Sequence, residues 1–93
     1  GLKSLSLNRT KITDKSLKHL LVVKNLTILL LNDTEVSDEG TATLALLPRL
    51  EWLYLNRTRV TDASMKKLGD LSELRFLSLL GTLVTDSGVA DLH

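Results

Sequence analysis

Cysteine is absent from this chain of 93 residues, and proline and aromatic residues are scarce. Without cysteine the chain can form no disulfide, no thiolate metal site and no cysteine nucleophile. It contains only one Trp, one Tyr, one Phe and one Pro. A strong charge of one sign is also missing, since twelve basic residues stand against eleven acidic ones, for a net charge of +1. This balance predicts no binding to nucleic acid or to an anionic membrane.

Long apolar runs are missing too, because no stretch reaches the roughly 18–20 residues of a membrane-spanning helix. The first residues have the pattern of folded core rather than of a signal peptide. Together with the lack of cysteine, these features favour the cytoplasm. Since the chain begins with Gly1 instead of Met, we expect a processed product or a fragment of a longer protein.

Leucine is abundant, and it recurs with a period of 24 residues. The recurring leucines are Leu2, Leu26, Leu50 and Leu74, then Leu5, Leu29, Leu53 and Leu77, then Leu7, Leu31, Leu55 and Leu79, and finally Leu20, Leu44, Leu68 and Leu92. The same period holds for Thr10, Thr34, Thr58 and Thr82, for Ile12, Val36, Val60 and Val84, and for Asp14, Asp38, Asp62 and Asp86. Such a period predicts one domain, residues 1–93, built from four stacked repeats without capping repeats. The repeats span about residues 2–25, 26–49, 50–73 and 74–93, the last one truncated.

Each repeat reads L-x-x-L-x-L-x-x-T-x-[IV]-[TS]-D and then continues as a helical pattern that ends in Leu. The alternation of Leu with other residues predicts a short strand with one buried face. The Thr-Asp or Ser-Asp pair that follows is a helix-start signal, because these side chains accept hydrogen bonds from free amide groups and Asp suits the positive helix end. Pro48 is expected to stop the second helix.

This pattern resembles the leucine-rich repeat family, and the resemblance covers residues 2–93. The family usually has Asn or Cys where this chain has the recurring Thr, so the tail of each repeat is similar to the cysteine-containing class of F-box proteins or to long bacterial arrays. The resemblance implies an α/β solenoid, a curved right-handed stack with a parallel sheet on its concave face and helices on its convex face. The recurring Thr hydroxyls would form an internal ladder that satisfies backbone groups.

All three aromatic residues fall between the inward leucines, at positions that point outward from the expected sheet. These outward columns are Ser4, Ile28, Trp52 and Phe76, and Ser6, Leu30, Tyr54 and Ser78. Neighbouring strands lie about 4.8 Å apart, so one contiguous patch is expected. The predicted partner-binding residues are Ile28, Leu30, Trp52, Tyr54 and Phe76. An apolar cluster of this kind is typical of an interface anchor, although aromatic residues also suit strand surfaces, and other parts of a longer protein could cover them.

Charged residues flank the strands and form a possible rim of the patch. These are Arg9, Asp33 and Arg57 at one end and Lys3, Glu51 and Arg75 at the other, with Lys11, Glu35 and Arg59 beyond them. The sign of the charge changes along these columns. The pattern can orient a partner, and it is equally the ordinary condition of a soluble surface.

The sequence shows no nucleophile, base and orienting group in a pattern that would bring them together in one catalytic site. His19 is expected on a solvent-facing helix position and His93 is terminal, so we predict no metal site. The column that begins at Asp14 is expected to act at its own helix starts rather than as a calcium ladder. No cofactor and no enzymatic activity are predicted.

The sequence therefore predicts a module that binds a protein or peptide partner on its concave sheet face. The alternative is a structural or assembly block from a longer array, which forms homo-oligomers through its uncapped ends. A further alternative is an accessory region that delivers a substrate to a catalytic domain outside this chain.

Overall fold

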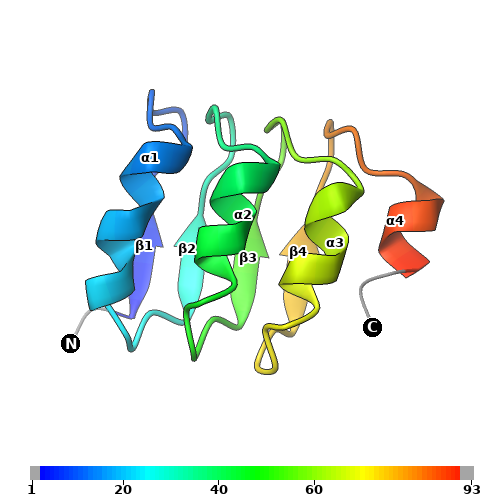
Figure 1. Ribbon diagram of the computed structural model, residues 1–93. Coiled ribbons are helices and arrows are strands. Elements are labelled where there is room, and N and C mark those ends of the chain that lie inside the picture. The colour runs from blue at the N-terminus through cyan, green and yellow to red at the C-terminus, as the bar shows by residue number, and fades with distance from the viewer. Residues whose placement is uncertain (1–2, 91–93) are drawn as a thin grey trace.

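The computed structural model describes residues 3–90 as a parallel sheet with helices packed along one side (Figure 1). The predicted leucine positions Leu2 and Leu92, and His93, lie outside the described residues. The strands are β1 (Ser4–Ser6), β2 (Ile28–Leu30), β3 (Trp52–Tyr54) and β4 (Phe76–Ser78). The helices are α1 (Asp14–Leu17), the 3₁₀ helix η1 (Lys18–Val22), α2 (Asp38–Leu44), α3 (Ala63–Leu68) and α4 (Asp86–Ala90).

The four strands follow chain order, and each residue pairs with the residue 24 positions later in the next strand. Leu5 therefore stands beside Leu29, and Leu29 beside Leu53. The middle residue of β2 and that of β3 are fully buried, as the period-two alternation predicts. The core lies between the sheet and the helices and is almost entirely leucine, with Val36, Val60 and Met65 filling the remaining space.

The helix-start signals are confirmed in position, because the helices begin at Asp14, Asp38, Ala63 and Asp86. The first helix differs from the others, since it tightens into the 3₁₀ helix η1 from Lys18 onward. The second helix already ends at Leu44, before Pro48. No helix among residues 3–90 has the length and apolar character needed to cross a bilayer.

Contrary to expectation, the Asp side chains do not cap their own helices by hydrogen bonds, although Asp14, Asp38 and Asp86 lie in the first helical turns, where a negative charge suits the positive helix end. At α3 the hydroxyl of Thr61 accepts from the Ala63 amide at 3.2 Å, as the helix-start signal predicts. Neither Thr13, Ser37 nor Asp62 makes a side-chain hydrogen bond to the start of its own helix. The carboxylates of Asp14, Asp38 and Asp62 instead reach into the next repeat. Asp38 accepts hydrogen bonds from the amide and the hydroxyl of Thr61 at 2.8 and 2.6 Å, and another from the Ser64 hydroxyl. The column thus joins neighbouring repeats rather than closing individual helices.

The same connection occurs at the other two junctions. The carboxylate of Asp14 accepts from the amide of Ser37 at 2.7 Å and from its hydroxyl. The carboxylate of Asp62 accepts from the amide and the hydroxyl of Thr85 at 2.6 and 2.5 Å. We call these three sets of bonds the aspartate junctions. Their donors are backbone and hydroxyl groups at the point where each chain segment enters its helix.

The predicted threonine ladder is confirmed. The hydroxyl of each recurring Thr donates to the carbonyl three residues earlier, at 2.7 Å in all four repeats: Thr10 to Leu7, Thr34 to Leu31, Thr58 to Leu55 and Thr82 to Leu79. The two inner members, Thr34 and Thr58, are buried. A buried carbonyl needs a partner, and these hydroxyls supply it within each repeat.

Candidate functional site

The sheet brings the five predicted partner-binding residues together on its outward face. Strand register places Trp52 between Ile28 and Phe76, and places Tyr54 beside Leu30. The Trp52 and Phe76 rings are stacked, with centroids 5.2 Å apart and an interplanar angle of 28°. The Tyr54 and Phe76 centroids are also 5.2 Å apart, with the rings tilted by 44°. We call these five residues the aromatic patch.

The aromatic patch is accessible, although its members also support one another. Trp52 is 40% exposed and Phe76 is 39% exposed, whereas the other three members are partly buried. Aromatic pairs whose ring centroids lie about 5 Å apart on neighbouring strands stabilise the sheet. Exposed aromatic side chains on an otherwise polar sheet surface are typical of an interaction site.

Four of the six predicted rim residues at the strand ends are already paired with one another. Arg57 forms a bidentate ion pair with Asp33, with nitrogen–oxygen distances of 2.6 and 2.9 Å. Arg75 lies 3.7 Å from Glu51. Each pair links adjacent repeats, since the sign change along the columns sets opposite charges side by side. Within residues 3–90, Arg9 and Lys3 are the predicted rim residues at the strand ends that have no such ion pair.

The rim at the end of the strands is built on left-handed backbone. Arg9, Asp33 and Arg57 have φ values of 59°, 58° and 56°, and the fourth repeat has Gly81 there with φ of 70°. This conformation turns each chain segment sharply out of the sheet. The amide of Asp33 then donates to the carbonyl of Asn56 at 2.9 Å, which fixes the rim to the next repeat.

An asparagine ladder runs beside this rim, and our sequence analysis did not assign it. The side-chain oxygen of Asn8 accepts from the amide of Asn32 at 2.8 Å, and that of Asn32 accepts from the amide of Asn56 at 2.9 Å. Asn56 in turn accepts from the amide of Leu80 at 2.7 Å. The signal was present as a further 24-residue column, in which Asn8, Asn32 and Asn56 are followed by Leu80.

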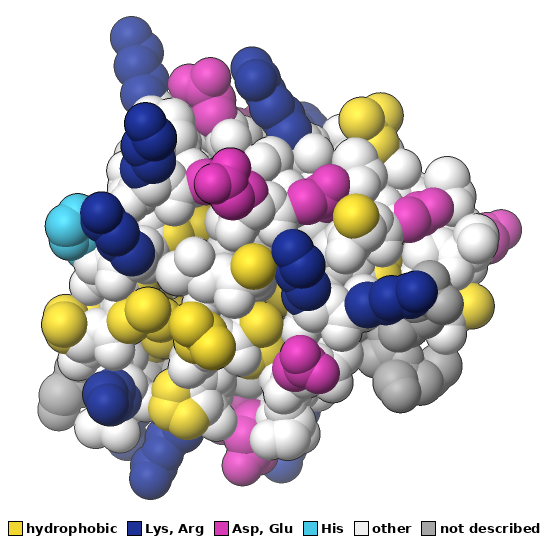
Figure 2. Space-filling view, in the orientation of Figure 1, with side chains coloured by type: hydrophobic (Ala, Val, Ile, Leu, Met, Phe, Trp, Pro, Cys, Tyr) yellow, Lys and Arg dark blue, Asp and Glu magenta, His cyan; other side chains and the backbone are white. Residues whose placement is uncertain are grey.

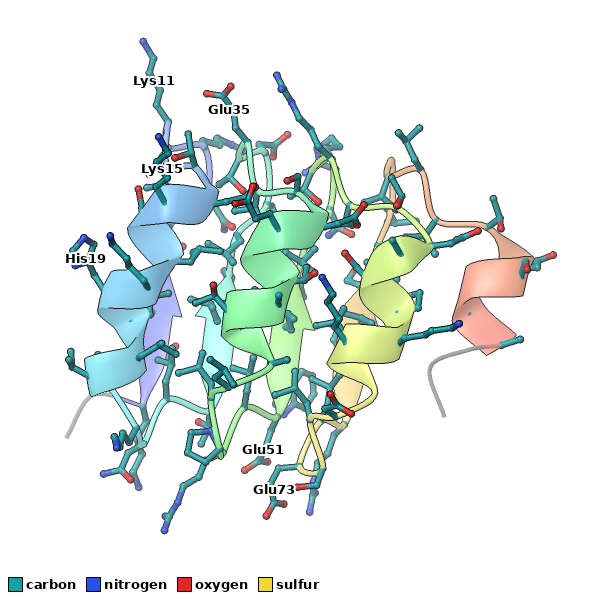
Figure 3. All side chains as sticks on the ribbon, viewed as in Figure 1. Lys11, Lys15, His19, Glu35, Glu51 and Glu73 are labelled. Carbon is teal, nitrogen blue, oxygen red and sulfur yellow. The ribbon has the colours of Figure 1, made fainter. Side chains whose placement is uncertain are left out.

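Two clefts lie at the ends of the strands, and neither is lined by a residue of the aromatic patch. One cleft of about 610 Å³ is lined by Lys3, Asn25, Thr27, Arg49, Glu51 and Glu73. Figure 3 shows Glu51 and Glu73 at the strand-start edge, where this cleft opens. A second cleft of about 310 Å³ is lined by Asn8, Arg9, Asn32, Asp33 and Arg57. Both are polar, whereas small-molecule sites are mostly apolar and concave. The aromatic patch is therefore an open surface suited to another macromolecule.

The pKa values of three aspartates are shifted by the contacts described above. Burial raises the pKa of Asp38, but hydrogen bonds from Ser64 and Thr61 outweigh it and hold the pKa below 3.8. The hydrogen bonds from Thr85 lower the pKa of Asp62. The hydrogen bond from Arg57 lowers the pKa of Asp33. All three carboxylates are thus held in their charged form by structural contacts between repeats.

His19 points away from the body of the molecule on the helix side, as the sequence predicts (Figure 3). Among residues 3–90, no three His, Asp or Glu side chains gather as metal ligands. The Asp column spreads over successive repeats, and three of its members are engaged in the aspartate junctions.

Comparisons with known proteins connect this architecture to a repeat protein of a bacterium. No protein-family model matches the chain, and no curated protein matches it. Among solved structures, an internalin (inlF) from Listeria monocytogenes is similar, with a TM-score of 0.61 and 26% sequence identity. The match covers 98% of this chain and 32% of the internalin chain, so this chain spans about a third of that protein. The internalin is a leucine-rich repeat protein, and this chain has a leucine-rich-repeat-like fold.

Proposed function

We propose that this chain is a protein–protein interaction module that binds a partner through the aromatic patch. Its four repeats form a curved right-handed solenoid, with the sheet on the concave face and the helices on the convex face. The observation that carries the proposal is the exposed stack of Trp52 and Phe76 on the outward sheet face. Interfaces concentrate their binding energy in aromatic anchors of this kind.

The likeness to a leucine-rich repeat protein supports an interaction role in general. The patch is about three strands wide, which suits an extended peptide or a protein surface better than a small molecule. We propose no reaction and no cofactor for the chain. Because the opposite charges of the rim pair with each other, the aromatic side chains supply the specificity and the rim contributes little affinity.

The single tryptophan makes the proposal directly testable. Peptides selected from a random library against the immobilised chain are titrated into it while Trp52 fluorescence is recorded. We expect a fluorescence change on binding, and a loss of affinity of about 30-fold or more in Phe76→Ala. The matched control is Leu83→Ala, because Leu83 is 70% exposed and lies outside the patch. Equal affinity of both variants would contradict the proposal.

A second candidate function is assembly through the outer strands. The leucines of β1 and β4 that face the core are partly exposed, whereas their counterparts in β2 and β3 are fully buried. An open strand edge with apolar side chains favours pairing with another chain. Sedimentation velocity distinguishes the two functions: assembly predicts oligomers that Leu5→Lys disrupts and Trp52→Ala leaves intact.

A further inference from the structure

Positive charge is concentrated in the first repeat, although basic and acidic residues nearly balance over the whole chain. Residues 3–25 contain six basic residues and one acidic residue. The basic residues are Lys3, Arg9, Lys11, Lys15, Lys18 and Lys24, and all six are exposed. The one acidic residue, Asp14, has its carboxylate occupied by Ser37 in the first aspartate junction. Residues 26–90 contain six basic and nine acidic residues and are therefore acidic overall.

These cations differ in their pairing from half of the other basic residues. Within residues 3–90, Arg49, Lys66 and Lys67 form no ion pair either, whereas the three remaining arginines do. Arg57, Arg59 and Arg75 each form an ion pair with an acidic residue of the preceding repeat. None of the six basic residues of the first repeat forms an ion pair within residues 3–90. Their charge is thus not neutralised by a fixed partner in this part of the molecule. A concentrated and unpaired positive charge attracts an anionic surface.

Four of the lysines lie on or next to the first helical segment, on the helix side of the molecule. Figure 3 shows Lys11, Lys15 and His19 projecting outward along the flank of α1. Lys18 lies one helical turn before Val22 in η1, and Lys24 follows two residues after it. We call Lys11, Lys15, Lys18 and Lys24 the basic flank. The hollow that Lys15 lines is also lined by two acidic residues, Asp14 and Glu39.

Two aliphatic side chains protrude beside the basic flank. Val22 is 82% exposed and Leu46 is 67% exposed. They occupy equivalent positions in the first and second repeats, 24 residues apart. Figure 2 shows hydrophobic side chains gathered over the lower part of η1 and the end of α2, with basic side chains around them. We call Val22 and Leu46 the apolar tips.

We propose that the basic flank and the apolar tips form a contact site for an anionic phospholipid membrane. The tips protrude and none of the clefts described above contains them, so they suit shallow insertion at a bilayer interface better than a pocketed protein interface. The flank consists of lysine, a strongly hydrated point charge, whereas specific carboxylate recognition favours the planar fork of arginine. Clusters of four or more lysines next to exposed apolar side chains bind anionic lipid headgroups. This site lies on the opposite side of the molecule from the aromatic patch, so both can be occupied together.

The test measures binding of the whole chain to vesicles. Vesicles of phosphatidylcholine with about one third phosphatidylserine are compared with pure phosphatidylcholine vesicles by co-sedimentation. We expect binding to the anionic vesicles alone, and a strong reduction of that binding when the salt is raised from about 0.1 M to about 0.5 M. Equal binding to both vesicle types, or no binding to either, would overturn the proposal.

Matched variants then locate the site. In Lys18→Gln/Lys24→Gln we expect a loss of vesicle affinity of about tenfold or more, since each lysine near the surface contributes about fivefold. The control is Lys66→Gln/Lys67→Gln, which removes the same charge from exposed positions of α3. Similarly, Leu46→Ser should weaken binding, whereas Leu83→Ser, at another exposed leucine, should not. Equal losses in the site and control variants would overturn the proposal.

A final experiment tests whether the basic flank binds a membrane or an acidic protein. Fluorescent poly-glutamate is titrated into the chain under the same conditions. Vesicle binding that exceeds poly-glutamate binding supports the membrane site. Binding of poly-glutamate without any binding of vesicles would overturn it and would assign the basic flank to an acidic polypeptide. Circular dichroism of every variant confirms that the fold is retained.

Discussion

The carboxylate of Asp38 accepts hydrogen bonds from both the amide and the hydroxyl of Thr61, which follows 23 residues later in the chain. The hydroxyl of Ser64 donates to the same carboxylate and also lies 2.8 Å from the Thr41 hydroxyl. The Asp38 carboxylate therefore accepts hydrogen bonds from the amide and hydroxyl at the start of the next helical segment and from the hydroxyl of the buried Ser64. It connects two repeats by bonds to a charged acceptor, which are stronger than bonds between neutral groups.

We expect Asp38→Ala to lower the free energy of unfolding by about 2–3 kcal/mol, because several donors lose a charged acceptor at once. Urea denaturation followed by circular dichroism measures the change. The matched control is Asp86→Ala, in the same column, whose carboxylate accepts no side-chain hydrogen bond within residues 3–90. It should cost less than about 1 kcal/mol. Equal losses in the two variants would contradict a special role for the aspartate junction.

Stability should decrease in acid as the same carboxylates become protonated. The pKa values of Asp33, Asp38 and Asp62 in the folded chain lie below the ordinary value of 3.8. The unfolded chain therefore binds more protons near that pH, so the stabilisation is complete above about pH 5 and is lost progressively as the pH falls further. Urea midpoints between about pH 7 and about pH 2.5 measure the effect. The double variant Asp38→Asn/Asp62→Asn should show a flatter dependence, and an unchanged slope would count against this origin.

Gly40→Ala should weaken the first aspartate junction. A methyl group at this position would overlap the Asp14 carboxylate and lie 2.8 Å from Cδ1 of Leu17. Asp14 would have to move away from Ser37, and we expect a loss of about 2 kcal/mol. Gly69→Ala is the control, because Gly69 has helical φ of −62° and is exposed. Thermal unfolding should give a clearly lower midpoint for Gly40→Ala alone.

The threonine ladder makes a separate prediction about buried hydroxyls. Thr58 is 6% exposed and its hydroxyl donates to the Leu55 carbonyl at 2.7 Å. Thr58→Val keeps the shape but leaves that carbonyl without its partner, so we expect a loss of about 1–2 kcal/mol. Thr58→Ser keeps the hydroxyl and should be the more stable of the two variants in urea denaturation. The reverse order would show that the methyl packing outweighs the hydrogen bond.

Much of the fold could be predicted from period alone. The leucine columns predicted the strands and their register, because a constant spacing of 24 residues places equivalent residues beside each other, and the resemblance to leucine-rich repeats implied that the sheet is parallel. The outward position of Trp52 and Phe76 followed from the same alternation, and the ring stack confirms that they meet. Whether a partner binds there stays a prediction.

Other features could not be predicted because they depend on contacts across repeats. The sequence analysis gave Asp38 to its own helix, as local capping rules suggest, yet the carboxylate bonds to Thr61. Local rules cannot show that the next repeat presents an amide and a hydroxyl at the right distance. The balanced total charge likewise gave no indication of the proposed membrane site, since a sum over the chain does not show that six of the nine basic residues without an ion pair among residues 3–90 lie in one repeat.

The sequence by itself determined the repeat length, the strand register, the inward leucines and the outward aromatic residues, because each of these follows from a local periodicity of two or 24 residues. The tertiary structure alone decided the partners of the polar groups. It joined each aspartate to the following repeat, paired Arg57 with Asp33, and left Lys18 and Lys24 without an ion-pair partner among residues 3–90. The physical reason is that apolar burial is non-directional and needs only the right face, whereas a hydrogen bond or an ion pair requires two particular atoms about 3 Å apart.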